Sequence, residues 1–343
     1  MKKILITGGA GYIGSHTLID LIDSTDFELI SLDNFDNSTP ISFKRVKQIS
    51  DKAITNYAID LTDLASLKAL FKENSISAII HFAAHKAVGE SVEQPLKYYH
   101  NNLQSLVNLL LCCEEFGVNN FIFSSSCTVY GQPRILPVHE NSPILPAESP
   151  YGNTKQIGEE IIKDFCEAHP NFKGIALRYF NPVGAHISGL NGELPTGVPS
   201  NLVPFVTQTA IGLREELTVF GADYNTRDGS CVRDYIHVSD VAHAHTLALN
   251  RLQNNNNNEQ FEVFNLGSGD GTTVLEAIKA FEKVSGVSLN YKIGPRRDGD
   301  IEQVYSDSTK AKNELEWETK ISLEEMMASA WKWELRLQEE RNK

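Results

Sequence analysis

The feature that most restricts the fold lies at the start of the chain, where a short apolar run enters a glycine-rich turn. Residues 4–6 are Ile-Leu-Ile and predict a buried strand, and a helix is predicted from Ser15 to Ile22. In a strand–turn–helix unit, glycines let the backbone approach a pyrophosphate, which the free N–H groups of the helix then bind. The turn therefore predicts a dinucleotide site that includes Gly8, Gly11 and Gly14.

An acidic residue follows the second predicted strand at the spacing that such a site requires. The strand at residues 27–32 ends at Asp33, nineteen positions beyond Gly14. A carboxylate about 20 residues past the glycines binds the adenosine ribose. Because a negative charge there repels a 2′-phosphate, the sequence favours NAD over NADP.

Strands and helices continue to alternate as far as residue 180. Strands are predicted at 53–59, 78–84, 121–126 and 174–180, with helices at 62–73, 95–116 and from Pro150 onward. This alternation predicts an α/β fold with a doubly wound, Rossmann-like parallel sheet. Ligands bind at the carboxyl ends of the strands in such sheets.

The composition changes after residue 180, where residues 181–200 are rich in Gly, Pro and Asn and predict a long loop. We expect an NAD-binding domain at 1–180 and a smaller, mixed α/β substrate domain at 181–343, with residues about 230–250 returning to the first. Later elements are predicted as helices at 202–213, 239–252, 273–284 and 323–337, and strands at 231–236 and 261–266.

Charge and composition exclude several classes of partner. The net charge of −13 argues against nucleic acid and against anionic membranes. No apolar run approaches 18 residues, so we expect no membrane span. The five cysteines are an odd number and no secretory signal precedes them, which favours a reduced, cytoplasmic protein.

A tyrosine and a lysine on one helical face form the candidate catalytic pair. Ser149 is predicted to cap the helix that begins at Pro150, and Tyr151 and Lys155 lie four residues apart on it. A free phenol titrates near pH ~10, so a base that works near pH 7 needs a shift of about three units, or ~4 kcal/mol. One cation ~5 Å away supplies roughly 3 kcal/mol at an effective dielectric of ~20. The pair therefore requires a second positive charge, which an oxidised nicotinamide would provide.

A tyrosine and a lysine four residues apart on a helix are common by chance. They indicate a catalytic pair only when a dinucleotide turn and a partner hydroxyl are also present. Ser126 ends the predicted strand at 121–126, at the edge of the sheet where ligands bind. Most serines at strand ends only satisfy backbone groups, so Ser126 remains a candidate on this argument alone.

Longer stretches extend the pattern over almost the whole chain, from Ile4 to about Trp333. The chain resembles the extended short-chain dehydrogenase/reductase superfamily and, more narrowly, its UDP-glucose 4-epimerases. The resemblance is carried by residues 81–84, 86–92, 121–131, 149–155, 178–185, 232–238 and 295–300.

The resemblance implies site residues as well as a fold. It implies that NAD is bound by Tyr12, Ile13, Asp33, Asn34, Phe35, Asp36, Asn37, Ser38, Asp60, Leu61, Phe82, Ala83, Ala84, His85, Lys86, Asn101, Ser126, Tyr151, Lys155 and Phe180. It implies that a UDP-sugar is held by Ser126, Tyr151, Asn181, Asn201, Thr218, Val219, Phe220, Arg233, Arg297, Asp300 and Val304. Arginine forks suit a diphosphate, which supports Arg233 and Arg297. The resemblance implies that no metal is bound. It also implies a homodimer, in which the helices at 95–116 and 150–168 are the candidate interface elements.

The activity that the resemblance implies is inversion at C4 of UDP-glucose or UDP-galactose through a 4-keto sugar. Two alternatives are weighed. A 4,6-dehydratase needs an acid and a base, which that family places directly after the active-site hydroxyl residue, and here those positions hold Cys127 and Thr128. A non-catalytic NAD-binding sensor would need neither the tyrosine–lysine pair nor a sugar-diphosphate pocket.

Substrate range is expected to depend on Val304. In the bacterial enzymes that the chain resembles, an aromatic residue at this position crowds the sugar 2-position. The smaller Val304 leaves room for an N-acetyl group, so turnover of UDP-N-acetylglucosamine and UDP-N-acetylgalactosamine is expected. A slip of one residue would instead direct Tyr305 toward the sugar.

Overall fold

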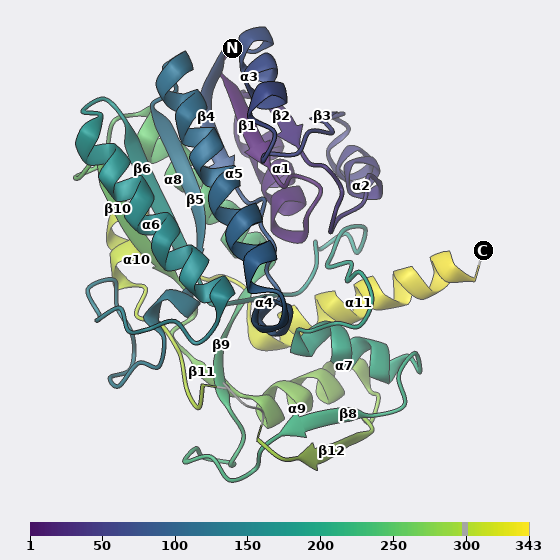
Figure 1. The fold of residues 1–343 in the computed structure, drawn as a ribbon. Helices are drawn as coiled ribbons and strands as arrows, with labels where there is room; N and C mark the ends of the chain where they lie inside the picture. Colours follow the sequence, from purple (N-terminus) through teal and green to yellow (C-terminus); the bar gives the residue numbers. More distant parts are fainter. Residues whose placement is uncertain (297–300, 343) are drawn as a thin grey trace.

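The computed structural model describes residues 1–296 and 301–342, and its larger part is a parallel β-sheet (Figure 1). Its seven strands are β1 (Lys3–Thr7), β2 (Glu28–Leu32), β3 (Thr55–Tyr57), β4 (Ile76–His81), β5 (Asn120–Ser126), β6 (Lys173–Tyr179) and β10 (Phe261–Leu266). They lie in the order β3-β2-β1-β4-β5-β6-β10. Strands are added outward on one side of β1 as far as β3, and the chain then crosses back to add β4 on the other side. The topological switch point, where ligands bind in such sheets, therefore lies between the carboxyl ends of β1 and β4.

Helices cover both faces of this sheet because successive side chains of each strand point to opposite sides. Ile4 and Ile6 of β1 pack in one core and Leu5 in the other. The first face is covered by α1 (Tyr12–Ser24), α2 (Ile41–Ser50), α8 (Val238–Gln253) and α10 (Thr309–Leu315). The second is covered by α3 (Leu64–Glu73), α5 (Pro95–Phe116) and α6 (Pro150–Ala168), and the short α4 (Val88–Glu93) precedes α5. The doubly wound fold is confirmed.

A smaller part lies below the sheet in Figure 1 and is built from short strands and three helices. One sheet joins β7 (Asn181–Val183), β9 (Val232–His237) and β11 (Gly271–Thr273), and a second pairs β8 (Leu217–Phe220) with β12 (Tyr291–Gly294). The helices are α7 (Leu202–Ala210), α9 (Val274–Ser285) and α11 (Leu323–Arg341). They enclose a separate apolar core that includes Phe281 and Met327.

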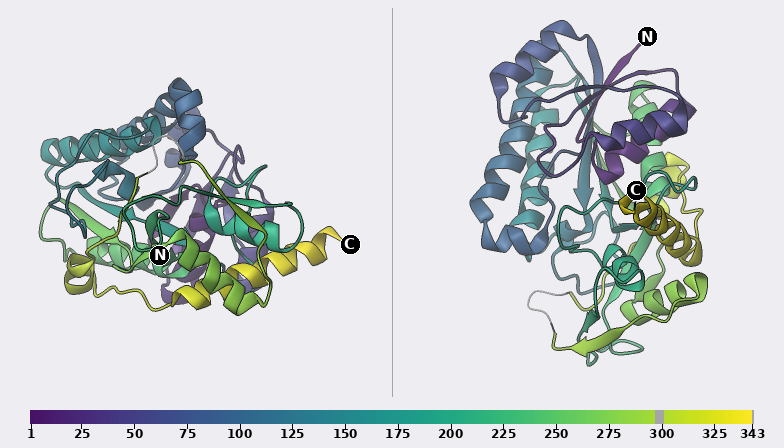
Figure 2. Two further views of the ribbon diagram at one scale, coloured as in Figure 1. Left: turned by 90° about the horizontal axis from the view of Figure 1, so that it is seen from below. Right: turned by 90° about the vertical axis from the view of Figure 1, so that its right-hand side faces the viewer.

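The two parts are interleaved in sequence. Residues 238–266 supply α8 and β10 to the larger part after the chain has already entered the smaller one. The long helix α11 runs between the two parts (Figure 2). Its Trp333 donates to the carbonyl of Glu193 at 2.8 Å and lies under the guanidinium of Arg45 on α2, 4.4 Å from its ring centroid.

Some predicted elements were correct and others were wrong or missing. The helix at 95–116 and the strand at 261–266 have the predicted bounds. The strand predicted at 53–59 covers only Thr55–Tyr57, and the one at 78–84 ends at His81 because the chain there turns into the site. The elements α2, α4, α10, β7, β8, β11 and β12 were not predicted. All except α2 are seven residues long or shorter and offer few periodic apolar positions, whereas α2 was missed although Phe43, Val46 and Ile49 recur at helical spacing. No helix among the described residues is long and apolar enough to cross a membrane.

One close contact in the fold gives a stability test. A β-carbon on Gly158 of α6 would lie 2.8 Å from the Phe123 ring of β5, whereas one on Gly89 of α4 would meet nothing within 4 Å. We expect Gly158→Ala to destabilise the protein by about 1–3 kcal/mol through overpacking. Gly89→Ala, the control, should change stability by no more than about 1 kcal/mol, in the stabilising direction. Thermal unfolding midpoints of the two variants check this, and equal midpoints would contradict the packing argument.

Candidate active site

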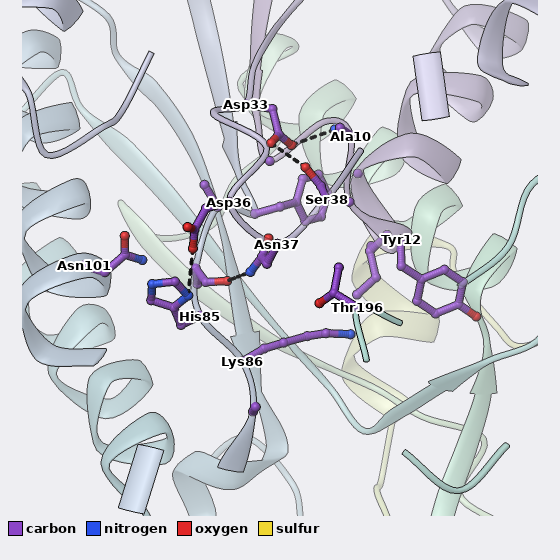
Figure 3. A pocket seen from close by; sticks show the side chains of 18 of the residues that line it. Ala10, Tyr12, Asp33, Asp36, Asn37, Ser38, His85, Lys86, Asn101 and Thr196 are labelled. Carbon is purple, nitrogen blue, oxygen red and sulfur yellow. Dashed lines mark hydrogen bonds and ion pairs between the residues drawn. The ribbon is translucent and has the colours of Figure 1, made fainter. Parts of the chain in front are cut away.

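A cavity of about 690 Å³ opens at the carboxyl edge of the large sheet. It is lined by the turn between β1 and α1, the ends of β2 and β4, the start of α6 and the loop at 192–201 (Figure 3). The glycine turn, Asp33 and the Tyr151–Lys155 pair, which are far apart in sequence, therefore share one space.

Two glycines of the turn, Gly8 and Gly14, are packed too closely for a side chain. Gly8 has a φ of +73°, and a β-carbon there would lie 2.7 Å from the backbone nitrogen of Ala83. A β-carbon on Gly14 would lie 2.3 Å from the carbonyl oxygen of Gly8. The first turn of α1 has no side-chain cap and no acidic residue. Its N–H groups are thus left for an anion, which fits the pyrophosphate of a dinucleotide.

Tyr12, for which the resemblance implies contact with the pyrophosphate, lines the cavity but directs its hydroxyl toward the smaller part. Its hydroxyl donates to the carbonyl of Gly184 at 2.6 Å, and Figure 3 shows its ring directed away from the other labelled side chains. Only the backbone of Tyr12 can therefore contact a pyrophosphate. Its ring instead joins α1 to the smaller part.

Asp33 organises the loop that follows β2. One carboxylate oxygen accepts from the Ala10 backbone N–H at 2.9 Å, and the other accepts from Phe35 N–H at 3.0 Å and Ser38 Oγ at 2.7 Å. A carboxylate has about four acceptor positions, so one remains for a ribose hydroxyl. Asn34, Asp36, Asn37 and Ser38 line the cavity. Phe35 does not, because its ring packs against Phe43 with centroids 6.2 Å apart.

The segment after β4 crosses the cavity mouth and is held by polar contacts (Figure 3). Asn37 Nδ2 donates to the carbonyl of Ala84 at 3.3 Å, and His85 Nδ1 lies 3.8 Å from Asp36. Lys86 pairs with Glu193 at 3.1 Å. The predicted cofactor residues Gly8, Gly11, Ile13, Gly14, Asp60, Leu61, Phe82, Ala83, Ala84, His85, Lys86 and Asn101 all line the cavity.

The tyrosine–lysine pair lies on α6 against the end of β5. Lys155 is only 4% exposed, and its Nζ donates to the carbonyl of Ser124 at 2.6 Å. The same nitrogen lies 5.9 Å from the centroid of the Tyr151 ring. The side chain of Ser126 lies near enough to Tyr151 to lower the pKa of its phenol. The three predicted catalytic residues are therefore adjacent, although Ser126 itself does not line the main cavity.

The protonation of this pair departs from the sequence-based expectation. Burial raises the pKa of Tyr151 to about 12, although the hydrogen bond from Ser126 opposes this. Burial lowers the pKa of Lys155 to about 8, although the charge of Glu159 opposes this. Desolvation thus dominates the pKa of Tyr151, and the lowering of that pKa expected from Lys155 is not among its causes. The protein's own groups keep Tyr151 protonated near pH 7, and about five units, or ~7 kcal/mol, remain to be supplied.

The predicted substrate residues lie mostly outside this cavity. Asn201 lines it, whereas Thr218, Val219 and Phe220 form β8 in the smaller part. Asn181 begins β7, and Arg233 of β9 lies near enough to Cys127 to lower the pKa of its thiol, which burial nevertheless raises to about 12. Arg297 and Asp300 lie outside the described residues.

Phe180 and Val304 share one apolar cluster beside the site. Val304 is 4% exposed, whereas the ring of Tyr305 faces Gly271 on β11. Of the two neighbours it is therefore Val304 whose side chain belongs to the cluster that contains Phe180. Cys127 packs against this cluster as well.

Several residues of the site were not predicted. Asn102 accepts from His85 N–H at 2.9 Å and donates to its carbonyl at 3.0 Å, so it fixes the segment after β4. Glu159 and Arg178 form a buried ion pair behind Lys155. Asn102 and Glu159 could have been noticed as polar residues on the buried faces of predicted helices. Glu193 lies in a loop, where no sequence pattern indicates that it belongs to the site.

Among the residues that the structure describes, no group of three or more His, Cys, Asp or Glu could hold a metal ion. The site's polar chemistry comes from hydroxyls, amides and single ion pairs.

Comparison with known proteins assigns the chain to a family. The UDP-glucose 4-epimerase of Bacillus subtilis is 50% identical over 331 residues, 96% of either chain, and that of the mouse is 45% identical over 342 residues, 97% of either chain. The chain belongs to the UDP-glucose 4-epimerase family. A broader family model, described as GDP-mannose 4,6 dehydratase, also matches residues 5–330.

Solved structures agree with membership of the epimerase family. UDP-glucose 4-epimerase from Bifidobacterium longum, in complex with NAD+ and UDP, superposes with a TM-score of 0.93 at 45% identity and covers 98% of each chain. The UDP-Glc/GlcNAc 4-epimerase from Campylobacter jejuni gives 0.84 at 41% identity and covers 98% of this chain and 100% of its own.

The glycine cradle provides a test of cofactor binding. We expect Gly14→Ala to weaken NAD binding at least tenfold, because the new β-carbon would displace the Gly8 carbonyl and with it the turn. Calorimetric titration of the purified variant with NAD measures this. Gly89→Ala, on an exposed helix away from the turn, is the control and should bind as the wild type does. Unchanged affinity in Gly14→Ala would show that the turn does not hold the cofactor.

Proposed function

We propose that this chain catalyses the reversible inversion at C4 of UDP-glucose and UDP-galactose, with NAD as a tightly held cofactor. The observation that carries the proposal is the convergence of the glycine cradle, Asp33 and a buried Tyr151–Lys155–Ser126 cluster in one place. The cradle and Asp33 fit the pyrophosphate and ribose of NAD. The epimerase relatives, which match over almost their full length, support the choice of substrate.

Each residue of the cluster has one task in this reaction. When bound, NAD supplies the acceptor and donor of the C4 hydride. Tyr151 takes the proton of the sugar 4-hydroxyl and later returns it, and Ser126 aligns the 4-oxygen with Tyr151. Lys155 keeps a positive charge beside the phenol. The sugar passes through a 4-keto form and must present its other face before the proton returns.

The larger part would serve as the NAD domain and the smaller part would hold the UDP moiety. Arg233 lies near enough to Cys127, the residue after Ser126, to lower the pKa of its thiol, and an arginine fork suits a diphosphate. Asn181, Thr218, Val219 and Phe220, together with Arg297 and Asp300, complete the proposed substrate set. Family likeness also supports a homodimer through α5 and α6, since α5 exposes Leu96, Val107 and Leu111.

Dehydration is the second candidate because the broader family model carries that name. The reaction needs an acid and a base after the active-site hydroxyl residue. Cys127 stands at one of these positions with a thiol pKa raised by burial to about 12, and the buried hydroxyl of Thr128 has no hydrogen-bond partner. Neither side chain can transfer protons readily near pH 7, so epimerisation is favoured. A non-catalytic sensor would have no use for a buried lysine beside a tyrosine.

The decisive assay needs no added reductant. Purified protein with NAD is incubated with UDP-galactose, and the products are separated by chromatography. We expect UDP-glucose to accumulate to equilibrium, with no net NADH. A 4-keto-6-deoxy product would instead establish dehydration, and unchanged UDP-galactose would reject both activities.

Tyr151→Phe tests the proton transfer. We expect turnover of UDP-galactose to fall by several orders of magnitude, since the phenol oxygen is the proposed base, while NAD remains bound. Activity is followed by UDP-glucose formation, and the bound nucleotide by its release on denaturation. Near-normal turnover in this variant would remove Tyr151 from the mechanism.

The proposed activity extends to N-acetylated sugars. Val304 belongs to the apolar cluster that contains Phe180, and valine is small enough to leave space where a tyrosine would not. The Campylobacter jejuni neighbour, described as a UDP-Glc/GlcNAc 4-epimerase, supports this range within the family.

Val304→Tyr tests the range. We expect turnover of UDP-N-acetylglucosamine to be lost while UDP-glucose turnover stays within about threefold, because only the N-acetyl group meets the added ring. Both substrates are assayed on the same preparation, and Val304→Ala serves as the control that should retain both. Equal losses for the two substrates in Val304→Tyr would mean that the ring disturbs the site as a whole.

A further inference from the structure

Consecutive serines at the end of β5 contact three side chains that are spaced four residues apart on α6. The carbonyl of Ser124 accepts from Lys155 and the hydroxyl of Ser125 donates to Glu159, while the side chain of Ser126 lies near enough to Tyr151 to lower the pKa of its phenol. Residues four apart share a helical face. Glu159 therefore belongs to the same row of side chains as the catalytic pair, one turn further from the cavity.

The carboxylate of Glu159 is held rigidly. Arg178 of β6 donates from Nε to one oxygen at 2.9 Å and from Nη2 to the other at 2.5 Å. Arg178 also donates to the hydroxyl of Tyr130 at 3.0 Å. Glu159 is 7% exposed and Arg178 is 5% exposed, so water screens this pair little. A two-pronged arginine contact fixes the position as well as the charge of a carboxylate.

Lys155 needs such a partner because it is buried. The other groups that face it carry no compensating charge. His81 of β4 is neutral, since burial and the charge of Lys155 lower its pKa to about 3. Tyr151 and Tyr179 are phenols whose pKa values are raised by burial, and Phe123 presents only its ring, 4.8 Å from Nζ. The carboxylate that supports the cationic form of Lys155 among the described residues is Glu159.

We propose that Glu159 is a positioning residue for this reaction, whose carboxylate, fixed by Arg178 and Ser125 one helical turn from Lys155, keeps Lys155 charged at the end of β5. It touches neither substrate nor cofactor and acts through Lys155. The inference rests on the proposed function only for its catalytic meaning, since the charge state of Lys155 is a property of the protein itself.

The primary test measures Lys155 directly. The Nζ resonance of Lys155 is followed by NMR in isotope-labelled protein over a pH titration, and is assigned by its absence in Lys155→Arg. We expect the midpoint to fall by roughly one pH unit in Glu159→Gln, the effect of removing a charge ~10 Å or less away at an effective dielectric of ~20. Glu160→Gln, which removes the same charge from the neighbouring exposed position of α6, should leave it unchanged.

Glu159→Gln leaves Arg178 buried without its partner and can fail to fold. The double variant Glu159→Gln/Arg178→Met removes both charges, an exchange that buried pairs commonly tolerate. We expect it to keep the lowered Lys155 midpoint, because Arg178 donates to Glu159 and Tyr130 whereas Lys155 donates to the Ser124 carbonyl. A wild-type midpoint in the folded double variant would overturn the proposal.

The pH profile of turnover supplies the catalytic readout. As Lys155 loses its proton, Tyr151 loses its neighbouring cation, so kcat falls on the alkaline side. That fall should move to lower pH in the double variant by the same amount as the Lys155 midpoint, while Glu160→Gln behaves as the wild type does. A shifted midpoint with an unshifted kcat profile would overturn the positioning role. Absence of epimerase activity in the wild type would refute the proposed function alone, since the NMR midpoint is still measured.

Discussion

A buried lysine is the constraint on which the site depends. Removing an ammonium group from water is costly unless its charge and its N–H groups are satisfied. Here Lys155 is met by a strand-end carbonyl and a fixed carboxylate one helical turn away. The close packing of α6 on β5, which brings Gly158 against Phe123, places all of these groups. The fold thus keeps a cation beside a phenol at a point where solvent does not screen it.

The phenol alone is not yet a base, and this separates the tasks of protein and cofactor. The desolvation that raises the Tyr151 pKa also strengthens the electrostatic interaction between Tyr151 and any charge placed near it. A cationic ring placed in the cavity therefore acts on Tyr151 far more strongly than it would in water. The protein would perform its proton transfer only when the hydride acceptor is present, which avoids an idle reactive phenolate.

Much of the larger part could be predicted from the sequence because its elements are long and periodic. Glycine spacing, Asp33 and the Tyr151–Lys155 helix were all recognisable from local pattern. The short strands of the smaller part were not, since three or four residues carry too little periodicity. Contacts such as the ion pair of Lys86 with Glu193 join segments that are far apart in sequence, so they cannot be predicted from a local sequence pattern. The residues expected to hold the UDP-sugar were predicted from the resemblance to known epimerases, because local sequence patterns could not show that they lie near the site.

The return of the chain to complete the large sheet has a consequence for how this fold can evolve. β10 pairs with β6 along six residue pairs, yet the two strands are separated in sequence by β7, α7, β8 and β9 of the smaller part and then by α8. A segment ending after Tyr179 would present β6 as an open sheet edge, which invites association with other chains. It would also leave bare the apolar surface that α8 covers. The larger and smaller parts therefore cannot be exchanged between relatives by a single recombination after Tyr179. New substrate ranges must arise by substitutions within one chain that keeps both parts together.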